Sequence, residues 1–386
     1  MVDLARLASE LERGEAVVAG VLSGTSGDGI DVVLARPQPG AAPEMLAFET
    51  AAFPGAGALE ARVRAALDGE PLDARAVALL DRDLGRAFGA AALRLGVEYG
   101  IPPKLVASHG QTVWHHDGDE ASGAATLQLG DGDEVALAAQ APAVSDFRSK
   151  DIAAGGEGAP LSALADGELF AAEARPLAIL NIGGMANLTL LGAAGEAQAF
   201  DTGPANALLD GLARRLLGRP LDEGGAAAAE GRVDEELVGE LLAHPYFGRP
   251  LPRSTGRDTF GEAWVESVAA RGARLRTEDL LRSAVELVAR SVADGLELAQ
   301  GEPPEAAGRL LVAGGGVHHG PLMAALAART GLRVATTAEA GIDPDAREAL
   351  VFAVLGARAV LGHPSTRPEA TGARPGVVLG KISTFP

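Results

Sequence analysis

Hydrophobic segments of strand length alternate along the chain with longer segments that have helical spacing. Residues 16–22 and 30–35 predict two β-strands on either side of a glycine-rich loop, and residues 45–53 predict a third, antiparallel strand. The segment 74–99, rich in Ala, Leu and Arg, predicts a long helix. Shorter strands are expected at 105–108 and 143–145.

The same order of elements (a hairpin, another strand, then helices) returns after residue 176. Residues 177–181 and 186–191 predict a second hairpin around a glycine turn, followed by a strand at 197–200 and a helix at 206–217. This repetition predicts two similar α/β domains that face a shared cleft. Further helices are expected at 233–242, 277–299, 321–329 and 343–361, with a strand at 309–313.

The composition is typical of a soluble protein and excludes several kinds of chemistry. With 33 Lys and Arg against 52 Asp and Glu, the net charge is −19, which argues against nucleic acid or an anionic membrane as the main partner. The absence of cysteine excludes disulfides, thiolate nucleophiles and Cys-ligated zinc. Neither a signal-peptide pattern nor an apolar run of membrane-spanning length is found, so a cytoplasmic protein is expected.

Three glycine-rich turns stand where hydrophobic strands are predicted to end: 23–29 (SGTSGDG), 181–184 (NIGG) and 313–316 (AGGG). Backbone N–H groups without side chains can approach a phosphate closely, and hydroxyl groups add further donors. The G-x-x-x-x-G-K-[ST] phosphate loop is absent. Each turn alone is compatible with a structural role, whereas the three together indicate one nucleotide held by two lobes.

Asp201 is the first residue of an Asp-Thr-Gly-Pro segment that lies between the strand at 197–200 and the helix at 206–217. A carboxylate at a strand end is rigidly held, which suits a general base. Asp directly before a helix also serves as an N-cap. The residues alone leave both roles open.

Polar residues also follow two of the short predicted strands. His109 and Gln111 suit hydrogen bonding to a polar substrate, with a solvated loop as the alternative. Arg148, close to Asp146, suits pairing with a substrate carboxylate, with plain surface charge as the alternative.

Two further segments have weaker signals. His115-His116-Asp117 has no evident third ligand nearby, which argues against a zinc site. The glycine-rich residues 153–160 (AAGGEGAP) indicate a hinge or a mobile substrate loop.

Eight motifs occur in the order found in anhydro-N-acetylmuramic acid kinases, a family that this chain resembles from about residue 17 to the C-terminus. They are SGTSGDGID, SHGQTVWH, DFRSKDIAAGGEGAP, NIGGMANLT, FDTGPANALLD, STGRDTF, GGGVHHGPLM and TGARPGVVLG. The resemblance implies an α/β fold with two actin-like (ribonuclease H-like) domains around a central nucleotide cleft. The N-terminal lobe, with the phosphate loop and sugar-side residues, is expected at 1–174 plus 345–386, and the lobe with the catalytic Asp and nucleotide-binding glycine loops at 175–344.

The resemblance also implies the reaction. Family members use water to open the anhydro ring of 1,6-anhydro-N-acetylmuramic acid and phosphorylate O6 from ATP, giving N-acetylmuramic acid 6-phosphate in the recycling of cell-wall murein. ATP and Mg²⁺ are thus the implied cofactors, with the metal bound mainly through the ATP phosphates. The implied partners are small molecules, with neither nucleic acid nor membrane, and a homodimer is plausible for the family.

The family's functional residues carry over onto matching positions. Asp201 resembles the catalytic base, which takes a proton from the attacking water. The residues implied to bind the nucleotide are Gly24, Thr25, Ser26, Gly27, Asp28, Gly29, Ile30, Asp31, Asn181, Gly183, Gly184, Gly203, Gly314, Gly315, Gly316 and Glu348. Those that resemble sugar-side residues are His109, Gln111, Asp146 and Arg148.

The chain departs from the common family residue at four positions. Glu157 replaces Gln in G-G-Q-G-A-P, Ala205 replaces the second Gly in D-T-G-P-G-N, Arg253 replaces Lys before S-T-G-R, and His319 replaces Asn after the glycine triplet. Ala205 is tolerable only at a negative φ, and Arg253 keeps the charge with a different geometry. Activity is still expected, since Asp201 and the first glycine loop are retained.

Three alternative functions stay open: a kinase of the same fold for another sugar or a carboxylate, a non-catalytic sugar or nucleotide sensor, and a glycoside hydrolase. The intact Asp28, Asp31 and Asp201 argue against a sensor. Glycoside hydrolases typically need two opposed carboxylates and no nucleotide loop, which disfavours the third alternative.

Overall fold

A computed structural model of the chain describes residues 3–24, 27–38, 40–116, 118, 122–300 and 308–384. The chain forms two compact units, one made of Met1–Ala172 with Ala346–Pro386 and the other of Glu173–Asp345. The sequence-based boundaries lie at 174/175 and 344/345. Residues 153–160 lie inside the first unit, so this segment is not the connection between the units.

The first unit contains a mixed sheet built around the N-terminal hairpin. Its strand order is β12 (Lys381–Ser383), β6 (Ala143–Ser145), β4 (Leu105–His116), β1 (Val18–Ser23), β2 (Ile30–Gln38) and β3 (Ala41–Ala51), with β5 (Ala125–Leu129) also paired to β4. Strand β1 is antiparallel to β2 and parallel to β4, and β2 is antiparallel to β3. Strand β6 is parallel to β4 and antiparallel to β12.

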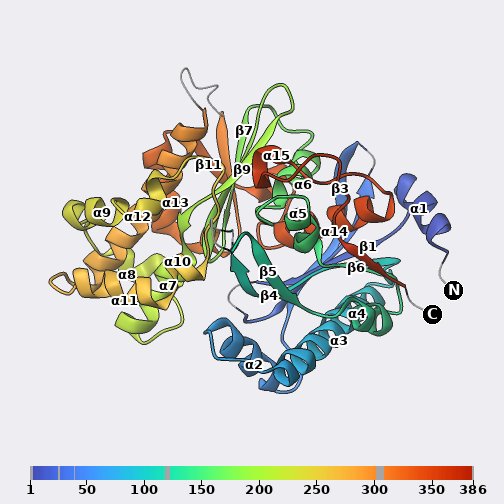
Figure 1. The fold of residues 1–386 in the computed structure, drawn as a ribbon. Coiled ribbons are helices and arrows are strands. Elements are labelled where there is room, and N and C mark those ends of the chain that lie inside the picture. The colour runs from blue at the N-terminus through green and yellow to red at the C-terminus, as the bar shows by residue number, and fades with distance from the viewer. Residues whose placement is uncertain are drawn as a thin grey trace. The chain divides into compact units, whose positions relative to one another are not determined.

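Helices of the first unit cover both faces of this sheet (Figure 1). They are α1 (Leu4–Glu12), α2 (Ala58–Leu67), α3 (Ala74–Glu98), α4 (Gly132–Ala139), α5 (Phe147–Ala153), α6 (Ser162–Leu169), α14 (Arg347–Val360) and α15 (Pro368–Thr371). Side chains alternate between faces along β1, so Ala19 packs in one hydrophobic cluster with Phe88 of α3 while Gly20 faces α14. A Cβ at Gly20 would lie 1.9 Å from the carbonyl oxygen of Ala349, so only glycine allows α14 to approach β1 this closely.

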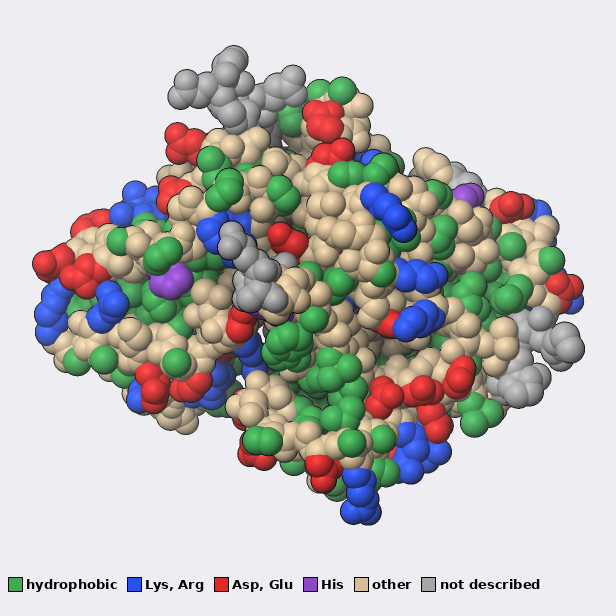
Figure 2. All heavy atoms as spheres, viewed as in Figure 1, with side chains coloured by type: hydrophobic (Ala, Val, Ile, Leu, Met, Phe, Trp, Pro, Cys, Tyr) green, Lys and Arg blue, Asp and Glu red, His purple; other side chains and the backbone are tan. Residues whose placement is uncertain are grey.

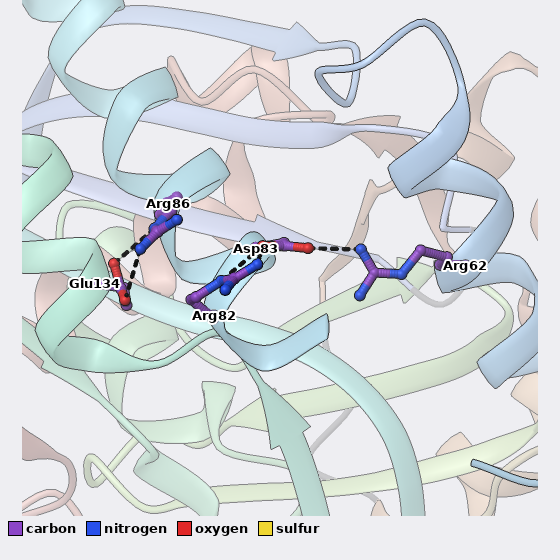
Figure 3. Close-up of polar contacts among 5 residues, drawn as sticks. All are labelled: Arg62, Arg82, Asp83, Arg86 and Glu134. Carbon is purple, nitrogen blue, oxygen red and sulfur yellow. Dashed lines mark hydrogen bonds and ion pairs between the residues drawn. The ribbon is translucent and has the colours of Figure 1, made fainter. Parts of the chain in front are cut away.

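Ion pairs link the helices on the α3 side of the sheet (Figure 3). Arg62 of α2 contacts Asp83 of α3 at 2.6 Å, and Arg86 of α3 contacts Glu134 of α4 at 2.9 Å. The arginine side chains are more than 40% exposed, so each pair adds only about 0–1 kcal/mol. The buried hydrophobic cluster is therefore the main stabiliser of this layer.

The second unit contains a five-stranded sheet in the order β11 (Arg333–Thr336), β10 (Arg309–Ala313), β7 (Leu177–Ile182), β8 (Met185–Leu191) and β9 (Ala197–Pro204). Its α-helices are α7 (Asn206–Leu217), α8 (Ala226–Ala229), α9 (Glu235–Leu242), α10 (Arg257–Phe260), α11 (Glu262–Arg271), α12 (Thr277–Gln300) and α13 (Gly320–Thr330). Short 3₁₀ turns are η1 (Glu223–Gly225), η2 (Pro245–Gly248), η3 (Gly315–His318) and η4 (Thr337–Ala340). Leu180, Leu188 and Phe200 of the sheet share one buried cluster with Leu208 of α7 and Val288 of α12.

The two sheets have the same topology. In each, a three-stranded antiparallel meander (β1–β2–β3 or β7–β8–β9) is extended from its first strand by two parallel strands, β4 and β6 or β10 and β11. This shared order is the ribonuclease H-like arrangement. The predicted fold class, an α/β protein with two domains of this type, is confirmed.

Two predicted strands are longer than the local pattern indicated. Strand β4 was expected to end at Ser108 but continues to His116, because its second half pairs with β5, a strand that was not predicted. His109 and Gln111 therefore lie within a strand rather than after it. Strand β9 continues through Asp201 to Pro204, because this part pairs with the start of β8.

The helix predicted at 343–361 begins only at Arg347. Before it, the amide of Asp345 donates to Asp343 Oδ1 at 2.9 Å, which makes a polar turn in place of a helical start. Among the described residues, no helix is both long and apolar enough to cross a membrane. On the face drawn in Figure 2, acidic and basic side chains are interspersed rather than gathered into one patch.

Candidate active site

The first glycine loop connects β1 to β2 in the first unit. Thr25 and Ser26 lie outside the described residues. Gly27 has a φ of +62°, its amide donates to Gly24 O at 3.2 Å, and a Cβ on it would come within 2.6 Å of Leu67. Asp28 is exposed and Gly29 is buried. The positive φ therefore favours glycine at position 27.

The far end of this loop is held by the hairpin. Ile30 is buried at the start of β2, and Asp31 Oδ1 accepts a hydrogen bond from Thr50 Oγ1 of β3 at 2.7 Å. At the near end, Gln111 Nε2 donates to Gly24 O at 3.1 Å. Gln111, which the family resemblance assigns to the sugar side, thus lies against the glycine loop.

Two buried polar side chains lie on paired strands at the point where β1 ends and β4 continues. Ser23 and Gln111 are opposite each other in the parallel pair, and both side chains are at most 2% exposed. Ser23 Oγ and Gln111 Oε1 have no hydrogen-bond partner among the described residues. A buried polar atom without a partner is costly. The Ser23 hydroxyl can donate to a phosphate, whereas the Gln111 amide oxygen only accepts and suits a hydroxyl group or the water of a hydrated cation.

His109 and Arg148 form a pair inside the first unit. Arg148 Nε donates to His109 Nε2 at 2.9 Å, and the other ring nitrogen, Nδ1, lies 3.2 Å from Gly110 O. The imidazole is 5% exposed and packs on Phe352 of α14, with ring centroids 4.5 Å apart. Burial and the neighbouring Arg148 charge hold the pKa of His109 well below its ordinary value, so the ring is neutral at pH 7.

Glu348 and Asp146 have different relations to this pair. Glu348 lies on α14, and burial raises the pKa of its carboxyl, against the opposing effect of the Arg148 and Arg347 charges. The side chain nevertheless keeps intermediate exposure to solvent. Asp146 precedes α5 with a φ of +53°, and its carboxylate pairs with Lys381 of β12. The Glu348 carboxyl is thus close enough to interact electrostatically with the Arg148 charge. Asp146 instead forms an ion pair with Lys381 on the edge strand β12.

The segment 153–160 is anchored by a buried carboxylate. Asp151 is fully buried, and burial raises the pKa of its carboxyl. Its oxygens accept from Gly158 N at 2.9 Å and from Thr371 Oγ1 at 2.8 Å. The backbone amide of Glu157, the residue that replaces the family's Gln, donates to Thr371 O at 2.9 Å. Residues 155–157 of the segment line a shallow depression together with residues 118, 123, 124 and 152.

Asp201 lies in the second unit, on β9, and is 8% exposed. Asn187 Nδ2 of β8 donates to Asp201 Oδ1 at 3.0 Å, and the amide of Thr255 donates to Oδ2 at 2.9 Å. Helix α7 begins after Ala205 and has no side-chain cap, so the N-cap alternative for Asp201 is wrong. Each carboxylate oxygen thus accepts a hydrogen bond from an N–H group, which holds the carboxylate in place.

The backbone of Asp201 also accepts a hydrogen bond from a buried cation. Arg253 is 2% exposed and donates from Nη1 to the carbonyl of Phe247 at 2.8 Å and from Nε to that of Asp201 at 3.3 Å. Tyr246 OH donates to the same Asp201 carbonyl at 2.7 Å, and the Arg253 guanidinium lies 4.9 Å from the Tyr246 ring centre. The guanidinium of Arg253 donates to several carbonyls at once through five N–H groups in a planar fork, whereas a lysine ammonium has three.

The remaining predicted glycines gather around the start of α7. The amides of Ala205 and Asn206 donate to the carbonyls of Gly184 and Gly183 at 2.9 and 3.0 Å. Gly203 packs so closely that a Cβ would lie 2.8 Å from Phe247. Ala205 itself has a φ of −136°, the negative value that its methyl group requires.

The third glycine turn lies against the second. A Cβ at Gly314 would lie 2.7 Å from the carbonyl oxygen of Ile182 and 3.1 Å from Asn181 Oδ1, and one at Gly316 would lie 2.2 Å from the Ile182 side chain. Gly315 opens the 3₁₀ turn η3. The amide of Leu322 donates to His319 Nδ1 at 3.3 Å, so His319 caps α13. The predicted residues of this unit thus form one cluster at the β7, β9 and β10 ends.

The chain matches the family model described as anhydro-N-acetylmuramic acid kinase over residues 16–385. It belongs to the anhydro-N-acetylmuramic acid kinase family. Relatives of that name are 39% identical over 374 residues in Gloeobacter violaceus (95% of this chain, 98% of the relative), 42% over 374 residues in Xanthomonas oryzae pv. oryzae (94% and 96%), and 38% over 372 residues in Shewanella oneidensis (95% and 98%). The family resemblance read from the motifs is thereby confirmed.

Solved structures with a similar course of the chain are more remote than these kinase relatives. An activator of 2-hydroxyisocaproyl-CoA dehydratase from Clostridium difficile aligns with a TM-score of 0.43 and 13% identity, over 89% of this chain and 95% of its own. A ROK family glucokinase from Streptomyces griseus aligns with a TM-score of 0.39 and 14% identity, over 87% and 97%.

Several residues around the candidate site were not among the predicted ones. Asn187 and Thr255 hold the Asp201 carboxylate, and Tyr246 holds its backbone. Asn187 and Thr255 lie within the quoted NIGGMANLT and STGRDTF motifs, so the signal was present but gave no role. Tyr246 lies outside every quoted motif, and only the folded chain brings it to Asp201.

Proposed function

We propose that this member of the anhydro-N-acetylmuramic acid kinase family uses ATP to open 1,6-anhydro-N-acetylmuramic acid with water and to phosphorylate O6. The product is N-acetylmuramic acid 6-phosphate, and the role is the recycling of cell-wall murein. Family membership supports the substrate. The observation that supports the chemistry most directly is that the Asn187 side chain and the Thr255 amide both donate to the Asp201 carboxylate.

In this proposal Asp201 is the general base. Its carboxylate takes a proton from the water that attacks the anomeric carbon, the C1–O6 bond breaks, and O6 leaves with the electron pair. O6 then attacks the γ-phosphate of ATP, and ADP leaves. Asn187 and the Thr255 amide keep the carboxylate in one orientation throughout, which is how positioned groups lower a barrier.

The nucleotide is proposed to bind through the three glycine turns. Gly24–Asp31 is the phosphate loop, with Asn181, Gly183, Gly184, Gly203 and Gly314–Gly316 on the second unit and Glu348 on α14. Ser23 Oγ fits this assignment, since this buried hydroxyl lacks a partner among the described residues and can donate to a phosphate. Mg²⁺, held mainly through the phosphates, would neutralise charge that develops on the transferred phosphoryl group.

The sugar is proposed to lie against the side of the first unit that carries His109, Gln111, Asp146 and Arg148. Arg148 supplies the positive charge suited to an anionic sugar substituent. We further propose a bacterial cytoplasmic enzyme, with a homodimer as the assembly and without nucleic acid or membrane partners. Light scattering of the purified protein measures the assembly directly, and a monomer at micromolar concentration would contradict a homodimer.

An assay of ATP turnover against four acceptors tests the proposed function. We expect ADP formation with 1,6-anhydro-N-acetylmuramic acid and none above background with glucose, acetate or N-acetylmuramic acid. Turnover with another acceptor alone would favour a kinase of different specificity. Ring opening without ATP would favour a hydrolase, and binding of both ligands without turnover would favour a sensor.

A further inference from the structure

Both ring nitrogens of His109 are engaged by the protein itself. Nε2 is the acceptor for Arg148 Nε at 2.9 Å, and Nδ1 lies 3.2 Å from the carbonyl of Gly110. A guanidinium nitrogen can only donate, and a carbonyl oxygen can only accept. The imidazole must therefore be unprotonated at Nε2 and protonated at Nδ1, which is one defined neutral tautomer.

The surroundings of His109 reinforce this state. Arg148 from α5 and His115 from the same strand both disfavour a proton on the ring, as does its burial against Phe352 of α14. Glu348, also on α14, interacts with the Arg148 charge. A protonated His109 would place a cation beside the guanidinium and lose the acceptor that Arg148 uses.

Arg148 is held at a second point by the anchored segment. Its Nη1 donates to Gly158 O at 2.7 Å, and Gly158 N in turn donates to the buried Asp151 carboxylate at 2.9 Å. Two nitrogens of one rigid, planar guanidinium are thus fixed by acceptors from two different elements, β4 and the loop after α5. Such a grip sets the orientation of the whole guanidinium plane.

We propose that His109 is a positioning residue: its neutral imidazole, protonated at Nδ1, orients Arg148, and Arg148 is the group that binds the anionic part of the sugar substrate. The proposal about substrate rests on the proposed function, whereas the tautomer and the Arg148 contact do not. His109 then acts on the sugar only through Arg148. Any acceptor at the Nε2 position should replace it, and a ring without an acceptor should not.

The first test reads the tautomer directly. In the full-length protein labelled with ¹⁵N-histidine, the His109 signals are assigned by their loss in His109→Gln. We expect a protonated Nδ1 and an unprotonated Nε2 that stay unchanged from pH 8 down to pH 5.5. A protonated Nε2, or titration near the ordinary histidine value of 6.5, would overturn the proposal whether or not the enzyme turns over the sugar.

The second test separates orientation from folding. His109→Phe keeps a ring against Phe352 but removes the acceptor, whereas His109→Gln places an amide oxygen near the Nε2 position. We expect His109→Phe to raise the KM for the anhydro sugar about 10- to 100-fold, from the loss of one charge-assisted hydrogen bond, with little change in the KM for ATP. We expect His109→Gln to restore most of that loss.

The exposed His363, replaced in the same way, is the matched control and should behave as wild type. Equal sugar KM values for His109→Phe and wild type, or no recovery in a folded His109→Gln, would refute the positioning role. Thermal unfolding of each variant identifies one that has failed to fold. If the wild type itself does not turn over the sugar, the proposed function fails while the NMR result still decides the His109–Arg148 contact.

Discussion

Replacing Asn187 with alanine removes an N–H donor that holds the Asp201 carboxylate. The lost bond joins Asn187 Nδ2 to Asp201 Oδ1 at 3.0 Å, and the Thr255 amide on Oδ2 remains. A hydrogen bond to a charged group contributes about 1.5–3 kcal/mol. If this energy keeps the base aligned with the attacking water, kcat should fall about 10- to 150-fold, since about 1.4 kcal/mol corresponds to a tenfold change in rate.

The assay is ADP release with saturating ATP and anhydro sugar, analysed for kcat and both KM values. Asn187→Asp should be worse than Asn187→Ala, because it places a second carboxylate beside Asp201. Gln198→Ala removes another amide side chain from the same sheet, on β9 three residues before Asp201, and should leave kcat within about twofold. A kcat for Asn187→Ala within twofold of wild type would show that this contact does not align the base.

Three further predictions concern stability. Asp166→Ala leaves the fully buried Arg347 guanidinium without its carboxylate and should cost about 3–5 kcal/mol in urea unfolding. Glu15→Ala, which breaks the exposed pair with Arg13, should cost far less, and equal costs would refute this. Burial raises the pKa of Glu348, so the stability that its protonated form provides is complete below pH 4.5 and is lost as pH rises through the raised pKa. The unfolding free energy of Glu348→Gln minus that of wild type should therefore grow as pH increases from 4.5, and a constant difference would contradict the shift. His319→Ala removes the side-chain cap of α13 and should lower the free energy of unfolding by about 1 kcal/mol. His319→Asn should lower it by only about a few tenths of a kcal/mol, because Asn is a favoured N-cap residue, and equal losses for the two variants would contradict this.

Local pattern was sufficient for most of the fold. The hairpin strands, the long helix α3 and the repeated order of elements follow from hydrophobic periodicity, because these elements bury regular faces. The second half of β4 was not predictable in this way, since its strand conformation depends on pairing with β5. The C-terminal strand β12, in a segment rich in Pro and Gly, likewise exists because it pairs with β6.

The candidate site shows the same division. Motifs marked Asp201, the glycine turns and Arg148 as candidates, because their residue types suit the proposed chemistry, and their roles stay predictions. They could not show that Gln111 lies against Gly24, that Asp146 pairs with Lys381, or that Tyr246 holds the Asp201 carbonyl. These contacts join residues 45 to 235 positions apart, and no local pattern encodes such pairs.

The role of Asp201 is tested most directly by Asp201→Asn, which keeps the shape of the side chain but removes its basicity. The first measurement is the rate at which ATP and 1,6-anhydro-N-acetylmuramic acid form N-acetylmuramic acid 6-phosphate. The second is the affinity for ATP, measured by calorimetry. The account predicts a fall in kcat of about 10²–10⁴-fold, with ATP affinity within a few-fold of wild type. Product formation at the wild-type rate would contradict it, because another group would then be taking the proton.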